Sequence, residues 1–167
     1  YRKTHLYGPE QQQFAPGEEL LITPIGPLRM GILICYDVEF SDAVAALARA
    51  GADLIAVPTA LMHPYGQVAT RVVPARAYEH QLYIAYANRC GREGDLAYCG
   101  ASCVVGPDGL DLARAQGEDP QLITAPVERN FMVTVRKENP LFAHQRPALY
   151  RRSVAAAQPA YFETPES

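Results

Sequence analysis

Short apolar runs separated by turn residues divide this chain into alternating candidate strands and helices. Buried strands are predicted at residues 20–23, 28–34, 53–60 and 82–88. Helices are predicted at 43–50, which is rich in alanine, and at 67–81, where Pro74 is expected to interrupt or kink the helix. This alternation favours an α/β fold built around a parallel β-α-β unit.

The second half of the chain continues with turn signals and shorter apolar runs. Gly106-Pro-Asp-Gly109 predicts a hairpin between strands at 100–105 and 110–114. A last strand is predicted at 121–127. The run 131–137 alternates as a strand does, but the charges near its end and the stop at Pro140 favour a helix. We expect one domain over residues 1–150, followed by an extended C-terminal tail over 151–167 that docks on a partner subunit.

Cys35 follows the apolar run Ile32-Leu-Ile34 at the point where a strand gives way to a helix. Ser41 offers an N-cap oxygen to that helix, and Gly51 stands where a left-handed C-cap is expected. A strand-to-helix turn exposes a side chain beside free backbone N–H groups, which favour a thiolate and later an oxyanion. Cys35 is therefore a candidate nucleophile, and the alternative is a buried structural cysteine.

Composition and charge narrow the classes of function. The 167 residues are 49% apolar and 20% charged, with a net charge of -3, an ordinary globular balance. No basic patch points to nucleic acid, and no apolar run is long enough to span a membrane. Without a signal-peptide pattern at its start, the chain is expected to work in the cytoplasm.

The four cysteines show neither a CxxC pair nor a spacing typical of metal ligands. We interpret them as free thiols rather than a disulfide framework. Cys90, Cys99 and Cys103 are expected to pack in the interior, and no metal or organic cofactor is predicted.

Several ordered motifs together resemble the nitrilase superfamily of carbon–nitrogen hydrolases, in its amidase and carbamoylase branches. They are Tyr1-Arg-Lys-Thr-His-Leu6, Phe14-Ala-Pro-Gly17, Gly31-Ile-Leu-Ile-Cys-Tyr-Asp37, Gly51-Ala-Asp-Leu-Ile-Ala-Val-Pro58, Arg76-Ala-Tyr-Glu79, Asn88-Arg89 and Gly106-Pro-Asp-Gly109. The resemblance implies a four-layer α-β-β-α sandwich, of which this chain gives the second half and lacks the N-terminal part. It also implies a homodimer or larger homo-oligomer.

The resemblance further implies a glutamate, lysine and cysteine triad, with the lysine at Lys3 and the nucleophile at Cys35. A second, supporting glutamate of the family falls at Glu10. The family's general-base glutamate precedes the lysine, and only Tyr1 and Arg2 precede Lys3 here. No residue of this chain takes that role, so we expect the chain to be part of a longer polypeptide.

The implied chemistry is hydrolysis of a small linear amide through a thioester, with release of ammonia. Lys3 is expected to stabilise the Cys35 thiolate and then the oxyanion, with the backbone N–H of Tyr36 as a second donor. His63 and Tyr65, on a loop after a strand, are candidate substrate-binding residues. Hydrolysis of N-carbamoyl amino acids is the alternative reaction, and the acyl group is left open.

Two other classes of function stay open at this stage. A chain that truly starts at Tyr1 would be a non-catalytic interaction module. A cysteine protease would need a histidine, namely His5, His63 or His80, within reach of the Cys35 sulfur. Asp37 is interpreted as an acceptor that fixes the turn.

Overall fold

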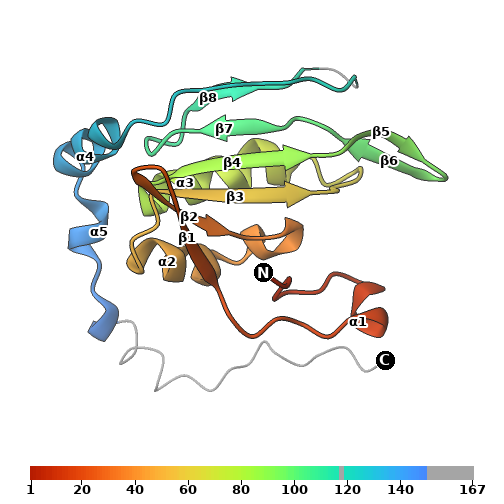
Figure 1. The fold of residues 1–167 in the computed structure, drawn as a ribbon, viewed down its shortest axis with the longest axis horizontal. Coiled ribbons are helices and arrows are strands. Elements are labelled where there is room, and N and C mark those ends of the chain that lie inside the picture. The colour runs from red at the N-terminus through yellow and green to blue at the C-terminus, as the bar shows by residue number, and fades with distance from the viewer. Residues whose placement is uncertain (117–118, 150–167) are drawn as a thin grey trace.

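The computed structural model describes residues 1–116 and 119–149 (Figure 1). A six-stranded sheet forms its centre, in the order β1-β2-β3-β4-β7-β8. These strands are β1 (Leu21–Ile25), β2 (Leu28–Ile32), β3 (Leu54–Thr59), β4 (Tyr83–Asn88), β7 (Cys103–Val105) and β8 (Asp111–Arg114). The mixed α/β class is confirmed, and the described residues supply one sheet of the sandwich.

The middle of the sheet is parallel and carries the predicted β-α-β unit. Strand β3 pairs in parallel with β2 on one side and with β4 on the other. Helix α2 (Ser41–Arg49) connects β2 to β3, and α3 (Val73–His80) precedes β4. Because the three parallel strands point the same way, their carboxyl ends meet at one edge, where α/β folds place ligand sites.

The two ends of α2 test the predicted caps. Gly51 has φ +90° and its N–H donates to the Ala48 carbonyl, while the Ala52 N–H donates to that of Leu47. This is the pattern of a Schellman motif, so the predicted glycine stop is confirmed. The predicted Ser41 cap is wrong: Ser41 is already inside the helix, and its hydroxyl donates to Glu79 at 3.4 Å.

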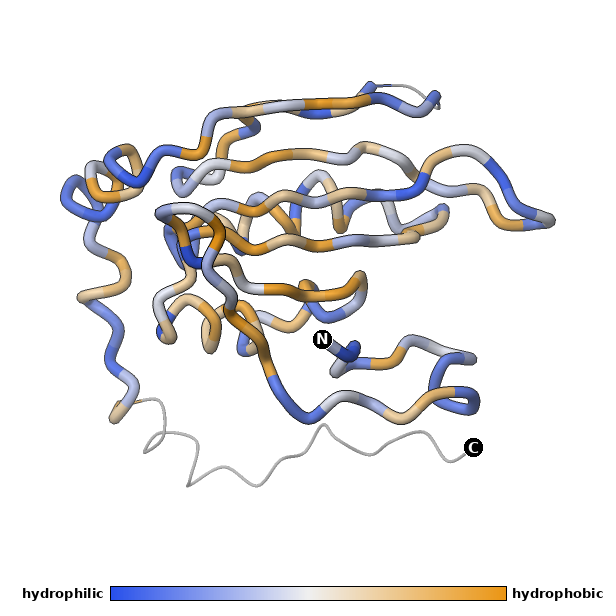
Figure 2. Tube along the Cα trace, viewed as in Figure 1, coloured by the Kyte–Doolittle hydropathy of each residue, from blue (hydrophilic) through white to orange (hydrophobic). Residues whose placement is uncertain are grey.

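One face of the sheet packs on α2 and α3, which lie behind it in Figure 1. The buried strand residues Ile55, Val57 and Ile84 meet the helix residues Leu47 and Val73 in a single core cluster. Figure 2 shows hydrophobic residues along β3, whereas β4 mixes hydrophobic and hydrophilic ones. The apolar pattern of the sequence therefore positions this layer.

The opposite face is covered only in part by the described residues. Met132 of α4 (Arg129–Glu138) packs there with Leu54 and Tyr83, at the start of β3 and β4. Toward the other end of these strands, Pro58 and Ala87 are exposed. The sheet is thus sealed by α4 at one end of this face and open at the other.

Helix α3 begins where Pro74 was expected to interrupt the second helix. A π-helical segment η2 (Val68–Val72) runs directly into α3, and Pro74 stands in the first turn of α3. Helical backbone continues without a gap from residue 67 to residue 80, so the chain is not interrupted at Pro74. What changes beside the proline, which lacks an N–H, is the type of helix, from π to α.

Three segments differ from expectation. The predicted strand at 121–127 is wrong, because these residues form no regular element, although the predicted helix around 131–137 is confirmed as α4. The loop expected at 10–14 contains a one-turn helix, α1 (Glu10–Gln13), and a hairpin of β5 (Cys90–Glu93) with β6 (Leu96–Cys99) was not predicted. A short helix α5 (Leu141–His144) follows α4.

The tail predicted at 151–167 lies outside the described residues. Within the part of the chain that the structure describes, no helix combines the length and apolar character needed to cross a bilayer.

Candidate active site

Cys35 lies three residues after the end of β2, at the start of the 3₁₀ helix η1 (Cys35–Glu39). Its φ is +50°, in the left-handed region that costs a non-glycine residue about 1–2 kcal/mol. Such strain persists only where surrounding contacts hold it, and it concentrates at functional sites. The sequence placed Cys35 at a turn, and the structure adds that the turn is strained.

Asp37 is the hub that holds this turn. Its side chain is fully buried and accepts the Ile34 N–H at 3.0 Å and the Tyr1 hydroxyl at 2.8 Å. It also accepts the Thr4 hydroxyl at 2.9 Å and the His5 N–H at 2.7 Å. Burial alone would raise the pKa of Asp37, but these hydrogen bonds outweigh it and hold the pKa below its ordinary value. The interpretation of Asp37 as a turn-fixing acceptor is confirmed.

Lys3 and Glu10 are brought together by the same N-terminal segment. The Lys3 ammonium donates to Glu10 Oε2 at 2.5 Å, and the Tyr7 N–H donates to the same oxygen at 2.8 Å. Burial opposes ionisation of Glu10, yet these two bonds and the charge of Lys3 lower its pKa. Only 12% of the Lys3 side chain is exposed, so this is a largely desolvated charge with one carboxylate partner.

Cys35 opens into a cavity of about 260 Å³ at the carboxyl edge of the parallel strands. The cavity is lined by Tyr7, Cys35, Tyr36, Glu39, Ala60, Leu61, Met62 and Tyr65. The rings of Tyr7 and Tyr36 meet edge to face, 5.2 Å apart between centroids, and Tyr65 adds a third ring 6.4 Å from Tyr7. The wall around the thiol is therefore aromatic and apolar, with one carboxylate.

The loop after β3 is fixed against the end of β4. Asn88, the last residue of β4, accepts the Leu61 N–H at 2.8 Å and donates to the Gly100 carbonyl at 2.7 Å. One side chain at the strand end thus anchors the loop that carries Met62 and Tyr65. The motif residue Asn88 has a structural task beside the cavity.

The predicted site residues fall into two groups linked by Tyr7. Cys35, Tyr36 and Tyr65 line the cavity, whereas Lys3 and Glu10 lie in an adjoining hollow. Tyr7 binds Glu10 through its N–H and lines the cavity with its ring. In this structure the Lys3 ammonium donates to Glu10 rather than to the Cys35 sulfur.

His63 is not part of the cavity wall. It is exposed, and its backbone N–H donates to the Ala97 carbonyl at 2.8 Å. Of the two predicted substrate-binding residues, Tyr65 lines the cavity and His63 does not. Position on the same loop was not enough to predict which of the two side chains borders the cavity.

A histidine-assisted site is not formed either. His5 Nδ1 lies 3.0 Å from Asp37 Oδ1, and its ring stacks on Phe40 with 3.9 Å between centroids. His80 is buried in α3 beside Glu79. Of the histidines in the described residues, none hydrogen-bonds to the Cys35 sulfur, which removes the geometry that a cysteine protease requires.

Glu39 is the lining residue that sequence reasoning missed. It ends η1, four residues after Cys35, and burial raises its pKa while the charges of Arg76 and Lys3 act in the opposite direction. The sequence carried no signal for it, because no helix was predicted over these residues and side chains four positions apart in a 3₁₀ helix do not share a face. Tyr7, from the N-terminal segment, had no signal either.

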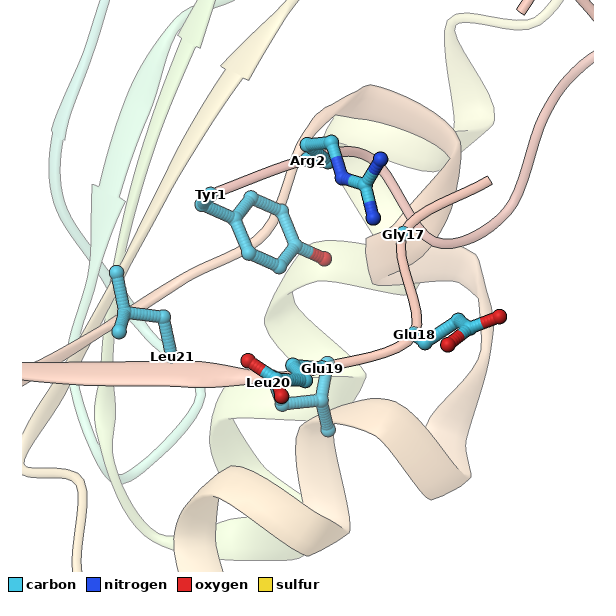
Figure 3. A pocket seen from close by; sticks show the side chains of 7 residues that line it. All are labelled: Tyr1, Arg2, Gly17, Glu18, Glu19, Leu20 and Leu21. Carbon is cyan, nitrogen blue, oxygen red and sulfur yellow. The ribbon is translucent and has the colours of Figure 1, made fainter. Parts of the chain in front are cut away.

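A second hollow of about 350 Å³ lies near the start of the chain (Figure 3). It is lined by Tyr1, Arg2 and the run Gly17–Leu21, without a cysteine or histidine. It offers no nucleophile, so the cavity at Cys35 is the better candidate for chemistry.

Comparisons with known proteins agree with this geometry. The family described as carbon-nitrogen hydrolase matches residues 1–137. A Pseudomonas protegens protein named "Hydrolase in pqqF 5'region" is 45% identical over 152 residues, covering 90% of this chain and 53% of that protein. Deaminated glutathione amidase of Bos taurus is 38% identical over 164 residues, covering 90% of this chain and 49% of that protein.

Solved structures of an amidase from Nesterenkonia sp. AN1 share the fold. One has a TM-score of 0.78 at 38% identity and covers 92% of this chain and 57% of that one. In a variant of that amidase, with a TM-score of 0.77, acrylamide has added to the active-site cysteine. This chain spans about half the length of the relatives it matches. On the family match and the shared fold, it belongs to the carbon-nitrogen hydrolase family.

Proposed function

We propose that the whole protein hydrolyses the carbon–nitrogen bond of a small linear amide. Cys35 attacks the amide carbonyl, ammonia leaves, and water hydrolyses the resulting thioester. The observation that carries this proposal is the strained turn that presents Cys35 to a cavity of about 260 Å³. The neighbouring amidase whose active-site cysteine reacts with acrylamide supports it.

Within this reaction, we assign Lys3 to electrostatic stabilisation. A protonated amine cannot accept the thiol proton, but it favours the thiolate and the oxyanion that follows. Glu10 orients it through the 2.5 Å bond. The Tyr36 N–H is proposed as the second oxyanion donor, and the base that takes the Cys35 proton is assigned to no residue of this chain.

The test measures ammonia release from butyramide by the full-length polypeptide. Acid quenching during turnover is expected to trap a butyryl adduct on Cys35, detected by peptide mass spectrometry. Lys3→Met is expected to lower kcat at least a hundredfold, the scale of losing one oxyanion partner. The matched control is Lys137→Met, which removes the chain's other lysine from the exposed end of α4 and leaves kcat unchanged.

Two outcomes would contradict the proposal. Turnover without any adduct on Cys35 would move the nucleophile elsewhere. Equal rates in Lys3→Met and Lys137→Met would remove Lys3 from the mechanism.

We also propose that the protein is a homodimer or larger and works in the cytoplasm. Tyr78 on α3 and Val133 on α4 are 46% and 57% exposed, so each of these helices presents a large side chain that a second copy would cover. The four free cysteines suit a reducing compartment. Sedimentation of the full-length polypeptide at micromolar concentration tests the assembly, and a lone monomer would contradict it.

A further inference from the structure

Glu39 places a carboxylate on the wall of the cavity that holds the candidate nucleophile. Cys35 begins the η1 helix, Glu39 ends it, and both residues line the same cavity. The backbone carbonyl of Glu39 accepts a hydrogen bond from Arg76 Nη2 at 2.9 Å, which anchors this end of the turn. The backbone from which the Glu39 side chain extends is thus anchored.

The two cations nearest to Glu39 are already paired with other carboxylates. Arg76 Nη1 lies 3.0 Å from Glu79 Oε2, and Lys3 lies 2.5 Å from Glu10 Oε2. Within the described part of the chain, the Glu39 carboxylate forms no ion pair. An incoming ligand would therefore meet a carboxylate whose charge is only partly compensated, and burial makes that charge costly.

The remainder of the wall suits a cation better than an anion. Three of the eight lining residues are tyrosines, Tyr7, Tyr36 and Tyr65, and none of the eight is Lys, Arg or His. An ammonium group gains from a carboxylate and from ring faces together, whereas a ligand carboxylate would be repelled by Glu39 and would meet no cationic side chain on this wall.

We propose that Glu39 forms a subsite for the acyl side of amides that carry an ammonium group, and that it discriminates against amides that carry a carboxylate. The inference rests on the proposed function, because it concerns the same cavity. It separates amides with a cationic acyl chain from the N-carbamoyl amino acids, whose free carboxylate would face Glu39.

The test compares three amides that share one chain length and differ in the terminal group. β-Alaninamide ends in an ammonium, butyramide in a methyl and succinamate in a carboxylate. In the full-length polypeptide, kcat/KM is expected to fall in that order, with a ratio of β-alaninamide to succinamate on the order of a hundredfold. Glu39→Gln keeps the shape and removes the charge, and it is expected to reduce this ratio about tenfold.

The matched control is Glu18→Gln. Glu18 is exposed and lines the hollow of Figure 3, away from Cys35, so its loss changes the net charge equally and should leave the ratio unchanged. An unchanged ratio in Glu39→Gln, or a wild-type preference for succinamate, would overturn the inference while butyramide turnover keeps the proposed function. Failure to hydrolyse any of the three amides would instead overturn the proposed function, and with it this inference.

A second measurement needs no variant. Added salt screens charge, so it is expected to lower kcat/KM for β-alaninamide, raise it for succinamate and leave butyramide unaffected. The same salt response for all three amides would contradict a charged subsite, even if Glu39→Gln fails to fold.

Discussion

The turn at Cys35 and the helix that follows it are neighbours in the chain but are held in opposite ways. The η1 turn is fixed by one buried carboxylate, Asp37, which collects hydrogen bonds from residues 32 to 36 positions away. Helix α2 is fixed by apolar packing, with Val44 fully buried and Leu47 1% exposed. The difference indicates that directional hydrogen bonds position the candidate nucleophile, whereas burial of apolar area stabilises the fold.

This contrast separates two kinds of loss. A change in the reactive side chain should remove activity and leave the fold intact. A change under α2 should weaken the fold and leave the chemistry of each folded molecule intact. A change at Asp37 should do both, because it holds the strained backbone of Cys35.

The largest expected effect comes from Cys35→Ala. Loss of the nucleophile is expected to lower kcat at least ~10³-fold, because no alternative thiol lines the cavity. The melting temperature should stay within about 2 °C, since alanine keeps the backbone and no hydrogen bond of Asp37 is lost. Calorimetry beside the ammonia assay checks both, and unfolding of the variant would contradict the separation.

Leu47→Ala tests the helix side of the comparison. The Leu47 side chain packs over Gly31 of β2, where an added methyl group would come within 3.0 Å of it. Truncation leaves a cavity that β2 has no side chain to fill, so unfolding should become easier by about 3 kcal/mol. Denaturant unfolding measures this, with exposed Ala46→Ser as the control on the same helix.

For Leu47→Ala, activity per folded molecule is expected to stay near that of the wild type at low temperature. A large drop in kcat without a drop in stability would mean that α2 takes part in positioning Cys35. The comparison between the two regions would then fail.

Helix α2 and the strands that it packs on are also the part of the fold that the sequence predicts well. Apolar runs placed β2, β3 and β4, and Gly51 marked the end of α2 because only glycine adopts its φ of +90° at little cost. These features depend on neighbours close in sequence. The same reasoning failed at 121–127, where an apolar run forms no strand and Leu122 is 93% exposed.

The site was only partly predictable, for a physical reason. Motifs identified Cys35, Lys3 and Glu10, but the segment that carries Lys3 is docked on the Cys35 turn through Asp37, across more than 30 residues of chain. The place of Tyr7 on the cavity wall depends on this docked segment. Ser41 likewise binds a distant partner, Glu79, instead of its own helix end.

Asp37→Asn keeps the shape of the side chain but weakens the turn that it holds. The amide keeps one acceptor oxygen and brings two donors to a place where the Tyr1 hydroxyl and the Ile34 N–H already donate to Oδ2. Stability is expected to fall by about 2 kcal/mol and kcat about tenfold, because Cys35 loses its fixed orientation. The control is Asp42→Asn, an exposed carboxylate at the start of α2. Loss of stability with unchanged kcat would show that the turn orients Cys35 without help from the Asp37 carboxylate.

The smallest expected effect is a pH dependence of stability, which a comparison of the wild type with Asp37→Asn can reveal. Hydrogen bonds hold the pKa of Asp37 below its ordinary value of 3.8, so the native state favours the ionised form. A depressed native pKa contributes stability that is fully present above the unfolded pKa and is lost as pH falls through the native one. The stability of the wild type should therefore decline below about pH 4. Asp37→Asn cannot titrate at this position, so the gap in unfolding free energy between the wild type and the variant should narrow as the pH falls from 7 to 3. Urea unfolding at stepped pH measures this gap in unfolding free energy.

A gap that stays constant would mean that protonation of Asp37 does not destabilise the turn. The turn would then be held by the shape of the Asp37 side chain rather than by its charge.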